Sequence, residues 1–536
     1  MRSREGRWRA VGLAAIAGLA TTGPPAASQG DPARAGAGAT LDAVEIRREN
    51  VFDQAETSNW LARAANSVHI VTREWVIARE LLIRPGEPFD SVTAAETERN
   101  LRKLGIFRDV SIDSVRSDSG LVARVTTHDA WTTQINTSFK AGGDQITWGV
   151  GLTEKNLLGA QFKATVRYTS DPDRSTIRFG ASLPRLWWNE LGITALYDEL
   201  SDGRHARLLA DAPFTSLSDR RAISFDLQYN DGDVLRFFEG ESEASDTLRH
   251  LMTKAIVAHG WAPRASPEGY LRVHTTLQFR REDFAPLPVE PLERSMFGEV
   301  EVSIEASRSR FTVVRGYQNL GGPEDIDLSS TMRVGVWLAP SAWGYERTGI
   351  GPVLTLQTGR RFPLGFVKAM LRGSALFNRT GLDSGSVTTG VVLALQPAAR
   401  HSIVLNGDVG WQDDPYPGEE FDLGLDFGPR GFPLHAFTGD RAFFTTGEYR
   451  WVAATDLYGL AAIGLAVFAD YGGAWYAGSP RRTGADAGVG LRFGSIRSSS
   501  GKAATRVDLA HRFANDVLDD EWVIAVGTGF PFTIGR

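Results

Sequence analysis

Residues 146–154 read ITWGVGLTE, and this stretch decides the fold that the sequence predicts. Its apolar side chains, Ile146, Trp148, Val150 and Leu152, alternate with threonine and glycine. A period of two places all four on one face of a β-strand and leaves small or polar groups on the other. We therefore predict a strand with one apolar face and one polar face that contacts water.

The same alternation recurs from Trp131 to the C-terminus, for example in FKATVRY (162–168), IRFGASL (177–183) and TRVDLAHRF (505–513). A soluble β-sandwich would alternate in a similar way. Two features favour a membrane barrel instead: the polar face is rich in Arg, Asp, Glu and Gly, and the strands run to about ten residues, the spanning length. Because lipid cannot pair backbone groups, such a sheet must close on itself. We predict a mainly β chain whose residues 130–536 form a transmembrane antiparallel β-barrel.

The first 28 residues have the pattern of an export signal. Arg2, Arg4, Arg7 and Arg9 precede an apolar run, and small residues follow at 26–28. A retained N-terminal anchor is the alternative, but the run is shorter than the about twenty residues that a spanning helix needs. Cleavage would remove four arginines and one glutamate, which changes the net charge from −6 to −9 (−6 − 4 + 1). This acidity argues against a nucleic-acid partner.

Residues 29–40 read as a flexible leader, and residues 41–129 as a small α+β domain. Two helices are predicted between its strands. VTREWVIARELL (71–82) has Thr72 as N-cap, and VTAAETERNLRKLG (92–105) begins with a capping box of Thr93 and Glu96. The expected order is strand, helix, helix, strand, strand.

Catalytic and metal-binding motifs are absent from the sequence. It contains no cysteine, no HExxH and no GxSxG. We expect no enzyme activity and no cofactor, and an outer-membrane hydrolase is the least favoured of three functional hypotheses.

The stretch GPRGF (428–432) raises the question of what Arg430 does. Strand parity in FFTTGEYRWV and AAIGLAVFAD points Glu448 and Asp470 into the lumen on neighbouring strands. Two inward carboxylates need a cation, and a loop folded back into the barrel could supply Arg430, whose fork engages carboxylates bidentately. Arg441 and Arg450 are competing cations.

A second Arg-Gly-aromatic triplet lies at Arg315. About two hundred residues follow Arg315, too many for five closing strands, whereas five strands follow Arg430. We interpret Arg315 as a charge at a strand end.

Together, Arg430-Gly431-Phe432 and the Phe-x-Asp-x-Gly of Phe468, Asp470 and Gly472 resemble the BamA/TamA outer-membrane assembly superfamily. REWVIARELLIRPGEPFD (73–90) is similar to part of its POTRA domain. The resemblance implies a barrel of sixteen strands after one POTRA-like domain. It also implies an arginine loop that enters the lumen and pairs with Glu448 and Asp470.

These observations predict a factor that inserts or translocates polypeptides at the outer membrane, with its N-terminal domain in the periplasm. The domain would capture client segments by strand addition, and the barrel seam would template their insertion. The expected partners are outer-membrane lipids, unfolded client proteins and periplasmic accessory proteins. A passive or structural barrel with a periplasmic domain is the alternative.

Overall fold

The computed structural model describes residues 39–52, 63, 66–67, 69–117, 120–142, 145–185, 191–237, 247–286, 295–320, 323–425, 427–458, 461–495, 504–515 and 518–528. The predicted export signal (1–28) and nearly all of the predicted leader (29–40) lie outside these residues. Within the described ranges, no helix is long and apolar enough to cross a membrane.

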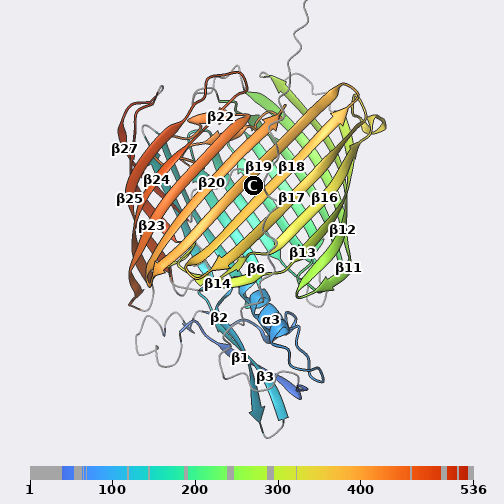
Figure 1. Cartoon of the computed structure of the whole chain (residues 1–536), viewed down its shortest axis with the longest axis vertical. Coiled ribbons are helices and arrows are strands. Elements are labelled where there is room, and N and C mark those ends of the chain that lie inside the picture. The colour runs from blue at the N-terminus through green and yellow to red at the C-terminus, as the bar shows by residue number, and fades with distance from the viewer. Residues whose placement is uncertain are drawn as a thin grey trace, which may run out of the picture.

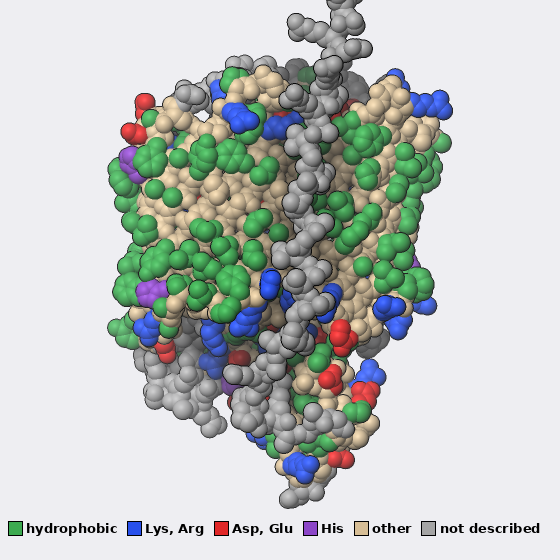
Figure 2. Space-filling view, in the orientation of Figure 1, with side chains coloured by type: hydrophobic (Ala, Val, Ile, Leu, Met, Phe, Trp, Pro, Cys, Tyr) green, Lys and Arg blue, Asp and Glu red, His purple; other side chains and the backbone are tan. Residues whose placement is uncertain are grey.

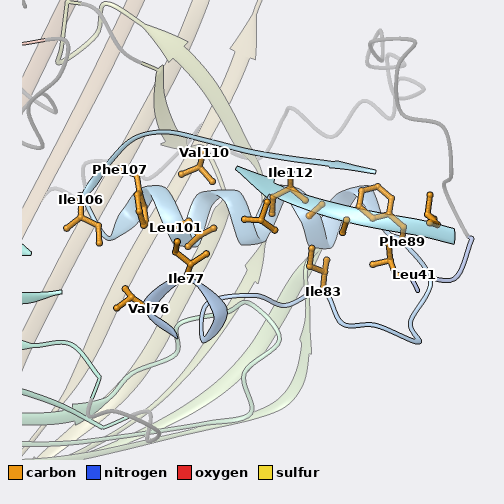
Figure 3. Packing of buried hydrophobic residues seen from close by; sticks show 14 residues of the cluster. Leu41, Val76, Ile77, Ile83, Phe89, Leu101, Ile106, Phe107, Val110 and Ile112 are labelled. Carbon is orange, nitrogen blue, oxygen red and sulfur yellow. The ribbon is translucent and has the colours of Figure 1, made fainter. Parts of the chain in front are cut away.

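The N-terminal part is a three-stranded sheet packed against two helices (Figures 1 and 3). Its elements are β1 (Ala43–Glu49), α2 (Glu74–Ala78), α3 (Ser91–Lys103), β2 (Phe107–Ser117) and β3 (Gly120–Asp129). The sheet order is β1-β3-β2, with β1 parallel and β2 antiparallel to β3. Leu101 of α3, Ile77 of α2 and Ile112 of β2 meet in a core from which water is excluded. This burial holds the helices on one face of the sheet.

Both predicted helix caps are wrong. Helix α2 is only five residues long, its N-cap is Arg73, and the Thr72 hydroxyl instead donates to Asp129 (Oγ1–Oδ2 2.9 Å). Helix α3 is capped by Asp90, whose carboxylate accepts the backbone N–H groups of residues 92 and 93. Glu96 is not part of a capping box because it accepts hydrogen bonds from a turn of the barrel.

The described residues between 133 and 528 form a barrel of twenty strands in which each strand is antiparallel to its neighbours (Figure 1). The strands are β4 (Thr133–Gly142), β5 (Gln145–Leu157), β6 (Phe162–Ser170), β7 (Ser175–Leu183), β8 (Gly192–Leu200), β9 (Gly203–Ala212), β10 (Arg221–Val234), β11 (Leu248–Ser266), β12 (Gly269–Pro286), β13 (Ser295–Arg308), β16 (Ser330–Ala339), β17 (Gly349–Phe362), β18 (Gly365–Asn378), β19 (Gly381–Ala398), β20 (His401–Asp413), β23 (Arg441–Leu457), β24 (Ala461–Trp475), β25 (Gly484–Ser495), β26 (Thr505–Arg512) and β27 (Glu521–Thr528). A short 3-10 helix, η3 (Ser341–Trp343), lies between β16 and β17.

The expected number of sixteen strands is therefore wrong. Sixteen followed from the resemblance, whereas the alternating segments of the sequence number close to twenty. Each of the twenty strands pairs with the next around the ring, so none of them is a hairpin outside the wall.

On the side of the barrel that Figure 2 shows, apolar side chains lie over the middle of the outer face, and charged side chains gather near its two ends. On β5, the alternating residues Ile146, Trp148, Val150 and Leu152 are 54%, 44%, 47% and 53% exposed. The inner face carries ion pairs between neighbouring strands, such as Arg178–Asp198 (Nε–Oδ1 2.7 Å). An apolar exterior around a charged interior is the arrangement of a membrane barrel.

Two short hairpins lie outside the ring of strands. β14 (Phe311–Arg315) pairs with β15 (Pro323–Asp327) in the connection between β13 and β16. β21 (Phe421–Leu423) pairs with β22 (Phe437–Gly439) in the connection between β20 and β23. The first hairpin lies at the end of the barrel that faces the N-terminal domain (Figure 1), and the second belongs to the opposite end.

Candidate functional site: a buried arginine loop beside the barrel seam

Residues 424–425 and 427–436, between β21 and β22, belong to a loop that lies inside the barrel; we call it the arginine loop. Three of its side chains are almost fully enclosed: Leu425 is 1% exposed, and Arg430 and Phe432 are 0% exposed. The short β21–β22 pairing brings the two ends of the loop together. The loop therefore folds back into the lumen instead of extending into solvent.

Arg430 contacts three strands of the wall. Its Nε and Nη2 bind the two oxygens of Asp470 on β24 at 2.7 and 3.1 Å, which is a bidentate pair. Its Nη1 lies 2.9 Å from Glu448 Oε2 on β23 and 3.3 Å from Asp508 Oδ2 on β26. The guanidinium also stacks on Phe468, with its carbon 3.6 Å from the ring centroid. The structure thus brings together Arg430, Glu448, Phe468 and Asp470.

The residues beside Arg430 allow this close approach. A Cβ on Gly431 would lie 2.9 Å from the Cβ of Asp486, so a larger residue would push the loop off the wall. The backbone N–H of Gly431 donates to Asp486 Oδ2 at 2.9 Å. The ring of Phe432 covers Gly484, where any Cβ would collide with it. Gly472 has a similar role on β24, where a Cβ would meet the backbone of β23 at 2.7 Å.

The cluster around Arg430 is larger than the sequence predicted. It contains these buried arginines and carboxyl groups, with the buried Arg512 beside them: Arg430, Arg450, Arg492, Arg506, Glu448, Asp470, Asp486 and Asp508. Arg492 links Glu448 (Nη2–Oε2 2.8 Å) to Asp508 (Nη1–Oδ1 2.5 Å). Strand parity already placed Arg506 and Asp508 on the inner face. Strand parity did not give the height of each residue along the barrel axis, and this height decides which side chains contact one another.

The competing cations have different positions. Arg450 also pairs with Glu448 (Nε–Oε1 2.5 Å), so that carboxylate is shared. Arg441 instead donates to backbone oxygens, including that of Gln412. Arg315 is exposed at the end of β14, but its neighbour Tyr317 reaches the cluster through its carbonyl oxygen, which accepts from Arg450 Nη1 at 2.5 Å. The second triplet therefore contacts the cluster through its aromatic residue's backbone, a contact that sequence reasoning missed.

The ring of strands closes through a very short seam. β27 and β4 share one registered pair, Ala525 with Lys140. The flanking ladders are continuous, with eight pairs between β26 and β27 and ten between β4 and β5. The seam is therefore the weakest junction of the wall among the described strands.

The arginine loop contacts both sides of this seam. On the β27 side, Leu425 and Leu434 pack against Ala525. On the other side, the backbone N–H of Leu434 donates to Gln145 Oε1 of β5 at 3.0 Å. His435 Nε2 lies 2.7 Å from Asp173 in the turn after β6. The loop thus spans the junction from inside.

His435 is held between two carboxylates. Its Nδ1 lies 2.5 Å from Asp422 Oδ2, and its ring stacks on Phe237 at 3.5 Å. Burial disfavours the charged imidazolium, but hydrogen bonds and charge from Asp173 and Asp422 outweigh it and raise the pKa of His435 to about 9. The histidine is therefore charged at neutral pH and fixes the loop to the rim.

Within the described ranges, no group of three or more His, Asp or Glu side chains is arranged to hold a metal ion. Arginines and carboxylates of the cluster pair with one another, which suits a structural clamp.

The chain is similar to several solved structures. BamA from Haemophilus ducreyi lacking POTRA domains 1–3 matches with 12% identity over 91% of this chain and 84% of that chain, at a TM-score of 0.40. CdiB from Escherichia coli matches with 12% identity over 91% and 76%, at a TM-score of 0.46. CdiB from Acinetobacter baumannii matches with 10% identity over 90% and 72%, at a TM-score of 0.41. No known protein family and no curated protein matches the sequence.

At these identities the matches concern the fold alone. The function proposed below rests on the contacts inside this chain.

Proposed function

We propose that this protein inserts or translocates polypeptides at the outer membrane by opening its β27–β4 seam. The observation that carries the proposal is the single registered pair between these strands, Ala525 with Lys140. Among the described residues of β27 and β4 no other pair is registered, so an incoming strand could pair with the edges beyond Ala525 and Lys140. Opening here breaks fewer hydrogen bonds than opening any flanking ladder.

The arginine loop would control this opening. It packs on Ala525 of the last strand and binds Gln145 near the first, so the seam can part widely only after one of these contacts is released. The cluster around Arg430 anchors the loop to β23–β26, so the contacts with β5 and the β6 turn are the ones that separate first.

The N-terminal sheet would act as a POTRA-like capture domain in the periplasm. β1 lies at the edge of the sheet, and its last three residues, 47–49, are exposed. A client segment in extended conformation could add to this edge through main-chain hydrogen bonds. The domain is docked on the barrel, for example through Arg73 Nε and the carbonyl of Leu158 (3.0 Å), so a captured segment would lie near the barrel entrance.

A disulfide across the seam tests the proposal. The chain has no cysteine, so Ala525→Cys with Lys140→Cys introduces the only two thiols. The client is a small urea-unfolded outer-membrane barrel protein, diluted into liposomes that hold the variant. We expect oxidation to abolish the acceleration of client insertion and reduction to restore it.

The matched control is Ala510→Cys with Val523→Cys, a registered pair within the continuous β26–β27 ladder. Oxidation of this pair should leave client insertion unchanged. Full activity of the oxidised seam variant would refute seam opening.

A passive barrel is the second candidate, favoured by a polar cavity of about 600 Å³ in the lumen beside the connection that contains the arginine loop. In that case the loop only braces a pore. The same liposomes separate the two functions, because a passive barrel gives solute leak that oxidation of the seam does not change, and no acceleration of client insertion.

A further inference from the structure

A second cavity, of about 450 Å³, lies where the N-terminal domain meets the barrel. Helix α3 forms one wall, and the β14–β15 hairpin forms another. The turn between β9 and β10 and the first residues of β12 complete it. Cavities of this size accommodate a few side chains or a small molecule, not a folded domain.

The carboxylates that line this cavity are bound by the protein itself. Glu96 accepts from the Ser216 hydroxyl (2.9 Å) and from a backbone N–H (2.7 Å). Asp325 binds Arg102 through two hydrogen bonds of 2.8 and 3.2 Å. Glu324 accepts three backbone N–H groups of residues 317–319. These acids are therefore occupied.

Three cationic side chains of the lining, in contrast, form no ion pair with the described residues. Arg272 is sandwiched between Phe214 and Tyr270, at 3.9 and 3.7 Å from their ring centroids. It is 8% exposed. Its Nη2 donates to the carbonyl oxygen of Ser216 at 3.3 Å, and its buried Nε has no hydrogen-bond acceptor. Arg99 stacks on Phe311 at 4.5 Å. Among the described residues, neither arginine nor the exposed Lys103 has a carboxylate within ion-pairing distance.

We infer that this cavity binds a carboxylate of an extended polypeptide segment, an acidic side chain or a C-terminus, between the N-terminal domain and the barrel. A guanidinium held flat between two rings presents its N–H groups in one plane, and a planar carboxylate matches that fork. Phe214 and Phe311 provide apolar surface beside the charges, which suits a peptide with mixed side chains. The choice of a client peptide rests on the proposed function, whereas the anion site itself does not.

A lipid phosphate is the competing anion. The walls favour the peptide, because they come from α3, the hairpin, the β9–β10 turn and the start of β12, and not from the apolar outer face that lipid would cover. The experiment must therefore compare both anions.

Binding is measured on the full chain in a neutral detergent by fluorescence anisotropy. The probe is a labelled ten-residue peptide with alternating valine and glutamate, compared with its glutamine counterpart. We expect the glutamate peptide to bind at least tenfold more tightly. Arg272→Gln, Arg99→Gln and Lys103→Gln should each weaken its binding, by about tenfold for the two arginines and less for the exposed lysine.

The control variant is Arg84→Gln, an exposed arginine of the same domain outside the cavity. It should bind like the unmodified protein, and heat-modifiable gel migration should show that all variants are folded. If Arg272→Gln does not fold, Lys103→Gln decides alone, since its side chain is exposed. Equal binding of the two peptides, or equal losses in the cavity and control variants, would overturn the proposal.

Short-chain phosphatidylglycerol distinguishes the anion sources. If it binds with dependence on Arg272 and the glutamate peptide does not bind, the peptide assignment is wrong. Peptide binding without client insertion would leave the site standing and refute the proposed function. Client insertion without any preference for the glutamate peptide would support the proposed function and refute the carboxylate site.

Discussion

Replacing Arg430 with methionine should destabilise the closed barrel more than replacing any exposed arginine. The side chain is fully buried and binds Asp470, Glu448 and Asp508, with a further hydrogen bond to Thr446 Oγ1 at 3.2 Å. Its removal leaves the buried Asp470 without a cation among the described residues, whereas Glu448 and Asp508 keep other arginines. Removing one partner of a buried ion pair costs about 3–5 kcal/mol, because the charge of the other partner is left uncompensated. We expect a loss of this size in the free energy of unfolding.

Two further variants separate charge from geometry. Arg430→Lys keeps the charge but cannot bind both oxygens of Asp470 with a fork, so we expect a smaller loss of about 1–3 kcal/mol. Arg430→Met combined with Asp470→Asn also removes the carboxylate that Arg430→Met leaves without a cation. The double variant should therefore be more stable than Arg430→Met alone.

The assay is urea unfolding in lipid vesicles, followed by heat-modifiable migration on gels and by tryptophan fluorescence. Arg315→Met is the matched control, because it lies in the other Arg-Gly-aromatic triplet and its side chain is exposed. Equal midpoints for Arg430→Met and Arg315→Met would refute the reasoning. So would a double variant that is less stable than the single one.

Three other predictions follow from single residues. The raised pKa of His435 means that its contribution to loop docking is fully present below pH 6.5 and is lost as the pH rises through about 9. Limited proteolysis within 424–436 should therefore accelerate in that range, and His435→Gln should remove the pH dependence. Burial raises the pKa of Glu324 to about 7, although hydrogen bonds from three backbone N–H groups act in the opposite direction. The β14–β15 hairpin should therefore lose stability as the pH rises from 4.5 to about 7. Glu324→Gln should flatten that profile, measured by protease protection of the hairpin. Asp90→Ala removes the cap of α3 and should lower the stability of the N-terminal domain by about 1 kcal/mol in thermal unfolding, whereas Thr93→Val, at the wrongly predicted cap, should cost less.

The repeating pattern of the sequence determined much of the fold. Alternation in segments such as 146–154 is a local property, because neighbouring residues of a strand point to opposite faces whatever the strand pairs with. The same parity turned Glu448 and Asp470 inward. The Gly and Phe beside Arg430 marked a loop able to approach a wall closely.

Other features depended on contacts between distant parts of the chain. The number of strands follows from which segments pair around the ring, and the resemblance suggested sixteen where the structure has twenty. The sharing of Glu448 by Arg430, Arg450 and Arg492 depends on the stagger of β23, β24 and β25. The predicted capping box of Thr93 and Glu96 also depended on tertiary contacts. Glu96 binds a turn of the barrel, and Asp90 caps α3. Parity is set by each residue's own backbone, whereas the height of a side chain in the lumen is set by strand register, and register is a property of the closed sheet.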